Sequence, residues 1–312
     1  MSNAFDAPHF TNDEAARQMI EGIRWPSGPV CSHCGTVNHA YAVKGRPGLY
    51  RCAEKECRKD FTVTTGTVME RSKIALHKWM MGFYLMSASK KGMSAHQLHR
   101  ALGLTYQSAW FMCHRIREAM RDGGISGPLG GVGGIVEADE TYYGPVEKPR
   151  TATTSGRPFI KSGKTANKRP IVALVERGGN VRTFHVAVAD KATVAKIVSD
   201  NVAKGSRLHT DESRLYPEVG KMFAAHETVK HSAGEYARGD VNTNSAEGYF
   251  SIFKRGMTGI YQHCAEKHLH RYLAEFDFRY NHRIRLGIGD IERTRAAIRG
   301  VEGKRLTYRQ PH

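Results

Sequence analysis

The sequence lacks long apolar segments. No uninterrupted apolar stretch approaches the roughly 20 residues that a helix needs to cross a bilayer, and the longest are short segments such as Ile171 to Val175. The first twenty residues carry Asp6, Asp13 and Glu14 and contain no apolar run that resembles a secretory signal. These absences predict a cytoplasmic protein that has no membrane partner.

Acidic residues are few in comparison with basic ones. The sequence of 312 residues has 47 Lys and Arg against 30 Asp and Glu, which gives a formal net charge of +17. Such an excess favours a polyanionic partner, because each phosphate that the protein neutralises releases counterions. Nucleic acid is therefore the expected partner. The length exceeds that of one typical domain and predicts two or three folded units.

Cysteine is also scarce, but four of the six cysteines form two short pairs. Two residues separate Cys31 from Cys34, and four separate Cys52 from Cys57. In a cytosolic chain such cysteines indicate metal binding or packing rather than disulfides. Two knuckles of this kind at the ends of a hairpin can complete a closed site of four thiolates, in which zinc is structural and has no open position for catalysis. The spacing predicts a zinc ribbon.

Helical patterns follow the cysteines. A capped helix is predicted from Ser94 to Leu102 and a second helix from Tyr106 to Met120, with Gly103 in the turn between them. This arrangement is typical of helix-turn-helix DNA readers, although helical pairs with a glycine turn also occur without DNA binding. The residues of the second helix that we expect to contact DNA are Gln107, Arg115 and Arg117.

Three carboxylates then follow in an order that suits an α/β active site. Asp139 lies in a strand with alternating polarity, Asp211 ends a later strand, and Glu247 lies in an early turn of a helix. Taken singly, each acid has the pattern of ordinary solvated surface, and the ordered trio is more specific. Three such carboxylates can hold two magnesium or manganese ions, one activating the attacking oxygen and the other stabilising the leaving oxygen. The trio predicts attack on a phosphodiester.

The surroundings of Glu247 leave one assignment open. Lys254 lies seven residues further along the helix and nearly on the same face, because seven steps of about 100° fall about 20° short of two turns. Asn244 lies one turn before Glu247 and could complete the triad instead. We favour Glu247, because a charged ligand binds magnesium or manganese better than an amide does. Asn244 is then expected to contact DNA.

The strand that carries Asp139 belongs to a predicted mixed sheet. Strands from Arg169 to Val175 and from Val181 to Val186 form a hairpin, so part of this sheet is antiparallel. Glu137 and Glu140 are expected on the strand face opposite to Asp139, where they would not bind metal.

Two further segments are strongly basic. The insert at residues 145–169 is rich in Gly, Ser and Thr and has seven Lys and Arg against a single Glu. It is expected to grip DNA phosphates, the alternative being a solvated loop. The chain after Glu247 also has an excess of basic residues. The DNA contacts predicted in these segments are Lys161, Lys164, Lys168, Arg255 and Arg271.

Several blocks of the sequence together resemble one known family. They are the two cysteine pairs, Arg58 to Thr67, Glu137 to Gly144, His209 to Asp211, Asn244 to Gly256 and His268 to Asn281. In this order they are similar to the zinc-ribbon transposases of the fifteen-ninety-five family of bacterial insertion sequences. The resemblance implies an RNase-H-like DDE domain, and family members differ on whether an asparagine or a glutamate completes the triad. The positions that it marks as catalytic are Asp139, Asp211, Glu247 and Lys254.

The sequence therefore predicts a multi-domain α/β protein. Its expected parts are an N-terminal segment (1–25), a zinc ribbon (26–68), a helical DNA-binding segment (69–125), an RNase-H-like mixed sheet flanked by helices (134–286) and a basic C-terminal tail (287–312).

The predicted function is that of a nucleoid-associated DNA transposase. It would bind the terminal inverted repeats of its element, hydrolyse a phosphodiester and direct the freed 3′-hydroxyl at target DNA. A homodimer or larger assembly is expected, because two ends must be brought together. The alternatives are a DNA-binding regulator derived from a transposase, without chemistry, and a metal-dependent nuclease that cuts DNA without joining it.

Overall fold

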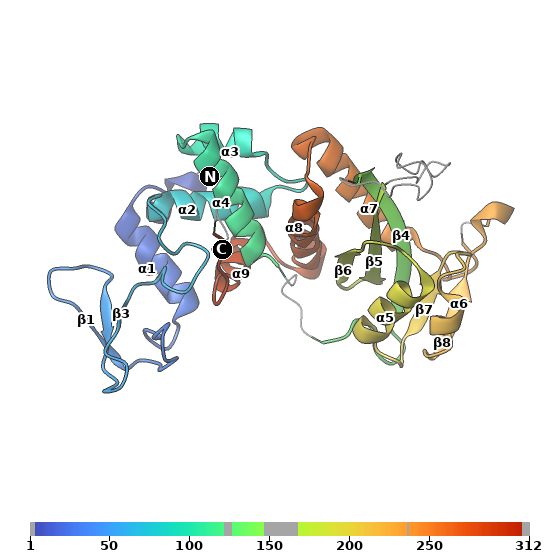
Figure 1. The fold of residues 1–312 in the computed structure, drawn as a ribbon, viewed down its shortest axis with the longest axis horizontal. Coiled ribbons are helices and arrows are strands. Elements are labelled where there is room, and N and C mark those ends of the chain that lie inside the picture. Colours follow the sequence, from blue (N-terminus) through green and yellow to red (C-terminus); the bar gives the residue numbers. More distant parts are fainter. Residues whose placement is uncertain (1–3, 122–126, 147–167, 236, 308–312) are drawn as a thin grey trace, which may run out of the picture. The chain divides into compact units, whose positions relative to one another are not determined.

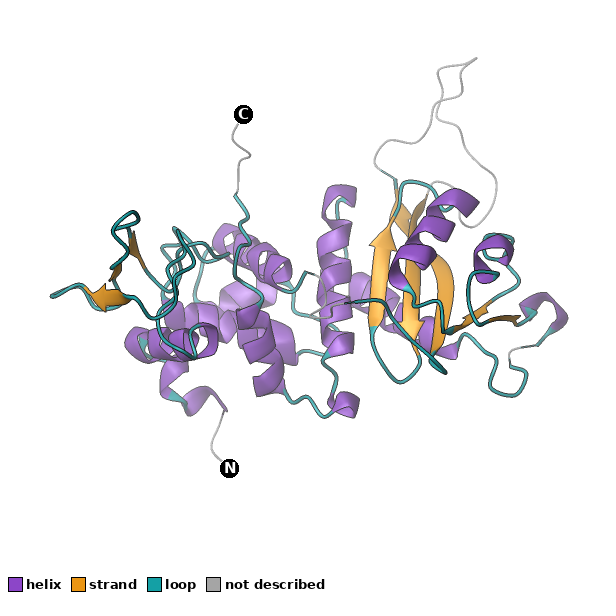
Figure 2. Cartoon of the chain, turned by 90° about the horizontal axis from the view of Figure 1, so that it is seen from below, coloured by secondary structure: helices purple, strands orange, loops and turns teal. Residues whose placement is uncertain are grey.

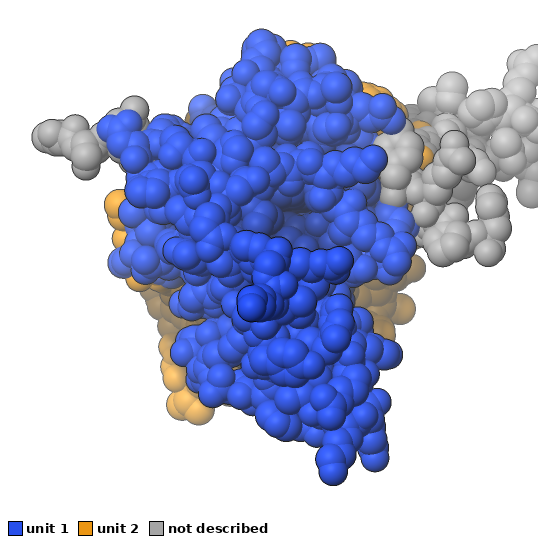
Figure 3. Space-filling view, turned by 90° about the vertical axis from the view of Figure 1, so that its left-hand side faces the viewer, with its two compact units in different colours: residues 1–121, 287–312 blue, residues 122–286 orange. Residues whose placement is uncertain are grey.

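The chain folds into two compact units. The computed structural model describes residues 4–121, 127–146, 168–235 and 237–307. One unit comprises Met1–Arg121 and Gly287–His312, and the other comprises Asp122–Leu286 (Figure 3). None of the helices in the described ranges has the length and apolar character needed to cross a membrane. Two predicted DNA contacts, Lys161 and Lys164, lie outside the described residues.

The first unit consists mainly of helices. They are η1 (Ala4–Asp6), η2 (Pro8–Phe10), α1 (Asp13–Arg24), α2 (Leu76–Ala88), α3 (Ala95–Leu102), α4 (Tyr106–Ala119) and α9 (Asp290–Arg299) (Figure 1). Helix α9 packs against α1, α2 and α4, and Trp79, Phe83 and Ile298 are buried in the core. The segment that the sequence suggested as a basic tail thus contributes a helix to this unit.

Helices α3 and α4 form the predicted helical pair. The Ser94 hydroxyl accepts a hydrogen bond from the Gln97 backbone N–H, and the Gln97 side chain in turn accepts one from Ser94, which completes a capping box. Gly103 ends α3 with a φ of 59°, a left-handed conformation that glycine adopts at no steric cost. Thr105 then caps α4 through the N–H of Ser108.

A small antiparallel sheet in the first unit carries the cysteines. Its strands are β1 (Ala40–Ala42), β2 (Tyr50–Cys52) and β3 (Asp60–Phe61), in the order β1-β2-β3. Trp25 at the end of α1 packs edge-on against Tyr50 and Phe61. Strands this short bury little apolar surface, so the sheet needs a further source of stability.

The second unit is built on a five-stranded mixed sheet of order β6-β5-β4-β7-β8. Its strands are β4 (Ile135–Pro145), β5 (Lys168–Glu176), β6 (Val181–His185), β7 (Arg207–Thr210) and β8 (Ala225–Thr228). Strands β4, β5 and β6 pair in antiparallel fashion, whereas β7 runs parallel to both β4 and β8. The predicted hairpin and the mixed sheet are confirmed.

Helices cover both faces of this sheet (Figure 2). On one face α7 (Asn244–Gly256) and α8 (Leu269–Asn281) pack over Ala173 through Phe253 and Phe276. On the other face α5 (Lys191–Asn201) packs through Val198 over Leu174, beside the short α6 (Pro217–Gly220). Alternate residues of β5 point to opposite faces and are buried on both, which accounts for its unbroken apolar sequence.

The outer strand β6 is covered at its free edge by side chains of α8. Asn281 accepts a hydrogen bond from the Val181 N–H at 2.7 Å and donates one to the Val181 carbonyl at 3.0 Å. Four residues earlier on the same helix face, the Asp277 carboxylate accepts the Thr183 N–H at 2.9 Å. Three backbone groups of this edge strand, the N–H and C=O of Val181 and the N–H of Thr183, are therefore satisfied by α8.

Candidate functional site

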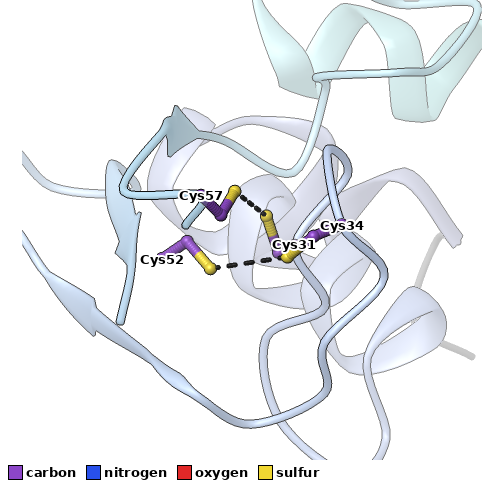
Figure 4. Close-up of side chains that lie close together, drawn as sticks. All are labelled: Cys31, Cys34, Cys52 and Cys57. Atoms are coloured by element: carbon purple, nitrogen blue, oxygen red, sulfur yellow. Dashed lines mark hydrogen bonds between the residues drawn. The ribbon is translucent and has the colours of Figure 1, made fainter. Parts of the chain in front are cut away.

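The four cysteines of the first unit converge on one point (Figure 4). All their sulfurs lie within 4.8 Å of one another, with 3.8 Å between Cys31 and Cys57 and 3.6 Å between Cys34 and Cys52. Four sulfurs at about 2.3 Å from a tetrahedral zinc ion would be separated by about 3.8 Å. The residues present therefore fit a structural zinc ion, with all four coordination positions filled by protein.

Local turns and hydrogen bonds prepare this cysteine quartet. The N–H of Gly35 bonds the Cys31 carbonyl, and the N–H of Cys57 bonds the Glu54 carbonyl, so each pair closes a tight turn. Hydrogen bonding to Thr36 lowers the pKa of the Cys34 thiol to about 6. A thiolate is the form that binds zinc, so this bond favours the ligand state.

In the second unit, the strand pairing brings Asp139 and Asp211 together. Strands β4 and β7 are parallel neighbours in which Ala138 lies opposite Thr210. Asp139 is the next residue of β4 and Asp211 is the first residue after β7, so the two carboxylates come at the same level of the sheet. Burial, together with the negative charges of Asp211, Glu140 and Glu247, raises the pKa of Asp139 to about 7. A divalent cation would relieve this repulsion, since it favours the ionised form of every carboxylate near it.

This raised pKa predicts that the contribution of Asp139 to the stability of the metal-free protein falls as the pH rises from about 4 to about 7. The folded state holds the Asp139 proton in this window and the unfolded chain, with a pKa near 3.8, does not. Burial raises the pKa of Asp277 to about 7 as well, so it contributes in the same direction. Comparison with Asp139→Asn isolates the Asp139 contribution, which we expect to be on the order of 1 kcal/mol. The measurement is urea unfolding at pH 5 and pH 8; an equal pH effect in both proteins would contradict the assignment.

Glu247 lies in the first turns of α7, beside these two aspartates. Its carboxylate accepts a hydrogen bond from the Thr243 hydroxyl at 3.1 Å and lies 3.5 Å from His231 Nε2. Among the described residues, only the cysteine quartet brings three or more potential metal ligands within 4.8 Å of one another. The structure thus pairs Asp139 with Asp211 and holds Glu247 beside them, turned toward Thr243 and His231.

The exposed face of α7 runs along the helix from this carboxylate. Four exposed residues follow one another at steps of three or four positions and so form one stripe: Asn244, Glu247, Ser251 and Lys254. Arg255 is exposed next to Lys254. The expected shared face of Glu247 and Lys254 is therefore present.

One expectation about the strand of Asp139 is wrong. Glu137 points to the same face as Asp139, because residues two apart on a strand share a face. It is fully buried and accepts hydrogen bonds from the backbone N–H groups of Ser245 and Ala246 at 2.7 and 3.1 Å. Glu140 alone points away from Asp139, where it accepts hydrogen bonds from Ser213 and Tyr216. The two-residue repeat of a strand is the sequence signal that places Glu137 on the face of Asp139.

The residues predicted to contact DNA from α4 differ in exposure. Gln107 is exposed in the first turn of the helix. Arg115 is partly buried, lies over the Phe111 ring and donates to the carbonyls of Glu70 and Leu306. Arg117 is only 2% exposed. Because much of α4 is buried in its unit, Arg117 belongs to the interior, and only the start of the helix presents a surface of the predicted kind.

The remaining predicted contacts lie in the second unit. Lys168 is exposed at the start of β5. Arg271 on α8 is partly buried and hydrogen-bonds His268.

Comparisons with known proteins agree with this geometry. The ISXO2-like transposase domain matches residues 131–281, which include the sheet and the three acids. The transposase zinc-ribbon domain matches residues 11–60, which include the four cysteines. The chain is also 29% identical, over 283 residues, to an uncharacterised protein in transposable element ISH50 of Halobacterium salinarum; the match covers 86% of this chain and 91% of that protein. With both domains in the same order on one chain, the protein belongs to the zinc-ribbon transposases of the fifteen-ninety-five family of insertion sequences.

Proposed function

We propose that this protein cuts a phosphodiester at the ends of its own element and joins the freed 3′-hydroxyl to target DNA. The observation that supports this most is the pairing of Asp139 with Asp211 on neighbouring parallel strands, with Glu247 on the adjacent helix. This arrangement lies within the part of the chain that the transposase domain matches.

The three carboxylates are proposed to hold two magnesium or manganese ions. Their oxygens are the hard donors that these ions prefer. Bound there, the ions would supply activation of the attacking oxygen and neutralisation of charge on the leaving oxygen. Asp139 and Asp211 fix two ligand groups on the rigid sheet, and Glu247 contributes the third from a helix end.

The exposed stripe of α7 is proposed to bind the DNA backbone next to the carboxylates. Lys254 and Arg255 place positive charge about two turns beyond Glu247, and Asn244 can hydrogen-bond a phosphate or a base at the other end. The other proposed DNA contacts are Gln107, Lys161, Lys164, Lys168 and Arg271. We further propose that two or more copies assemble on the terminal repeats, so that two ends are processed together.

This proposal is tested by comparing a variant of Glu247 with a variant of Asn244. We expect Glu247→Gln to lower magnesium-dependent cleavage of DNA that carries the element's ends by about a thousandfold, because an essential charged ligand is lost. Asn244→Ala, matched in position on the same exposed face, is expected to lower cleavage by about tenfold or less through weaker DNA binding. The measurement is a single-turnover assay that resolves cut and joined strands.

The outcomes separate the rival functions. Cutting without joined products by the unaltered protein would indicate a nuclease, and tight DNA binding with no cutting would indicate a regulator. If Asn244→Ala were the more damaging change, the asparagine and not the glutamate would complete the triad.

A further inference from the structure

The residue before helix α7 does not cap it. Thr243 makes no side-chain hydrogen bond to a backbone N–H group of the first turn, where Asn242 accepts only the N–H of Asn244, at 3.3 Å. The backbone N–H groups of the second and third helical residues, Ser245 and Ala246, are the ones that a cap normally satisfies. Both donate to Oε2 of Glu137, which comes from strand β4, and the Ser245 hydroxyl donates to Oε1 at 3.0 Å. A carboxylate from the sheet thus takes the place of the cap, where the helix dipole favours negative charge.

Arg177 completes this attachment. Its guanidinium donates to Glu137 Oε1 from Nε at 2.9 Å and from Nη2 at 2.7 Å. The same group donates to the carbonyls of Asp240 and Asn242 at 2.6 and 3.1 Å, in the segment that leads into α7. The approach to the helix and its first turn are therefore both bonded to one ion pair, in which the Glu137 carboxylate is buried and Arg177 is partly buried.

A similar arrangement holds the turn that contains Asp211. The Ser213 N–H donates to Asp211 Oδ1 at 2.9 Å, and the Ser213 hydroxyl donates to Glu140 Oε1 at 3.0 Å. The hydroxyl of Tyr216, which is fully buried, donates to Glu140 Oε2 at 2.6 Å. Glu140 therefore fixes the residue that bonds Asp211.

We propose that Glu137 and Glu140 are positioning residues: from either side of Asp139 on one strand, Glu137 places the helix of Glu247 and Glu140 places the turn of Asp211. Strand β4 then supplies one metal ligand directly and determines where the other two lie. This inference rests on the proposed function, because it assigns what the two glutamates do for that metal site.

The test compares Glu137→Gln with Glu275→Gln in the zinc-loaded full chain. Both glutamates are fully buried and paired with an arginine, Glu137 with Arg177 and Glu275 with Arg279. Glu275 also accepts a hydrogen bond from Tyr261, and neither Tyr261 nor Arg279 lies in β4, β7 or α7. Loss of general stability is expected in both variants, so only the effect on metal binding distinguishes them.

Two readouts measure that effect with Mn²⁺ as the probe. The first is the rise in melting temperature when Mn²⁺ is added, which reports binding to the folded state without any reaction. The second is the Mn²⁺ concentration for half-maximal DNA cleavage. We expect Glu137→Gln to raise that concentration about 10- to 100-fold, with a rate at saturating Mn²⁺ within a few-fold of the unaltered protein. Glu275→Gln is expected to leave it unchanged.

Milder variants keep the test decisive if Glu137→Gln does not fold. Ser245→Ala removes one bond to Glu137, and Tyr216→Phe removes one bond to Glu140; Tyr261→Phe removes a matching hydroxyl bond to Glu275. The first two should raise the half-maximal Mn²⁺ concentration several-fold and the third should not.

Equal Mn²⁺ dependence in all variants, with lower melting temperatures only, would overturn the positioning role. Failure of the proposed function has a different signature, because the unaltered protein would then show neither a Mn²⁺-dependent rise in melting temperature nor cleavage.

Discussion

Replacing Cys52 with serine is expected to unfold the zinc ribbon and to release its metal. Cys52 is fully buried at the end of β2, and its sulfur lies 3.6 Å from that of Cys34. The ribbon strands have only two or three residues each, so little besides zinc stabilises them. Structural zinc sites in finger peptides bind with apparent free energies of about 10–16 kcal/mol at neutral pH, and much of that would be lost.

Three measurements check this result. Zinc content by elemental analysis should fall well below one ion per chain, protease cleavage should appear between residues 26 and 68, and the fluorescence of Trp25 should change because its contact with Tyr50 is lost. Cys264→Ser is the control, since that cysteine lies in the second unit. Retention of stoichiometric zinc by the Cys52 variant would contradict the four-thiolate site.

Replacing Asp139 with asparagine is expected to lower both cleavage and joining by at least about a thousandfold while leaving the fold intact. The change is nearly isosteric and keeps an oxygen that can accept the Glu140 N–H. It removes a negative charge beside Asp211, and with it a main reason for divalent cations to bind there. Metal-free stability at neutral pH should rise slightly, because burial and the neighbouring negative charges, which raise the pKa of Asp139, no longer act on a charged group.

Activity, DNA affinity and stability are measured separately for this variant. Single-turnover cleavage should be lost, filter binding to the element's ends in the absence of metal should be retained, and circular dichroism should be unchanged. Asp200→Asn, an exposed change on α5 of the same unit, is the control and should keep full activity. More than a tenth of the original rate in the Asp139 variant would exclude this residue as a metal ligand.

Local spacing was enough to predict the cysteine quartet and the strands around Asp139. Two residues separate the cysteines of the first pair and four separate those of the second. Turns alone therefore bring each pair together, and the quartet could be predicted without tertiary information. The strand of Asp139 and the hairpin that follows were predicted from alternation and glycine turns, and the structure contains both. These elements depend on short stretches of chain.

Features that depend on distant segments were not predictable in the same way. Arg117 looked like a DNA contact because α4 has basic residues near its end, but α4 and α9 pack together in one unit, although they are far apart in the sequence. The role of Glu137 also depends on a helix that begins more than a hundred residues later. The sequence alone indicates only the face of the strand on which Glu137 lies, which is the face of Asp139, because residues two apart on a strand share a face.

The bonds from α8 to β6 also determine how copies of this protein can associate. An open β-strand edge is a template for strands of other chains, and it leads to domain swapping or fibrils when it is long and apolar. Here Asn281 and Asp277 bond the Val181 and Thr183 amide groups that an incoming strand would otherwise use. Fewer backbone groups are therefore open to a second copy on this side of the sheet, which disfavours its growth into an aggregate.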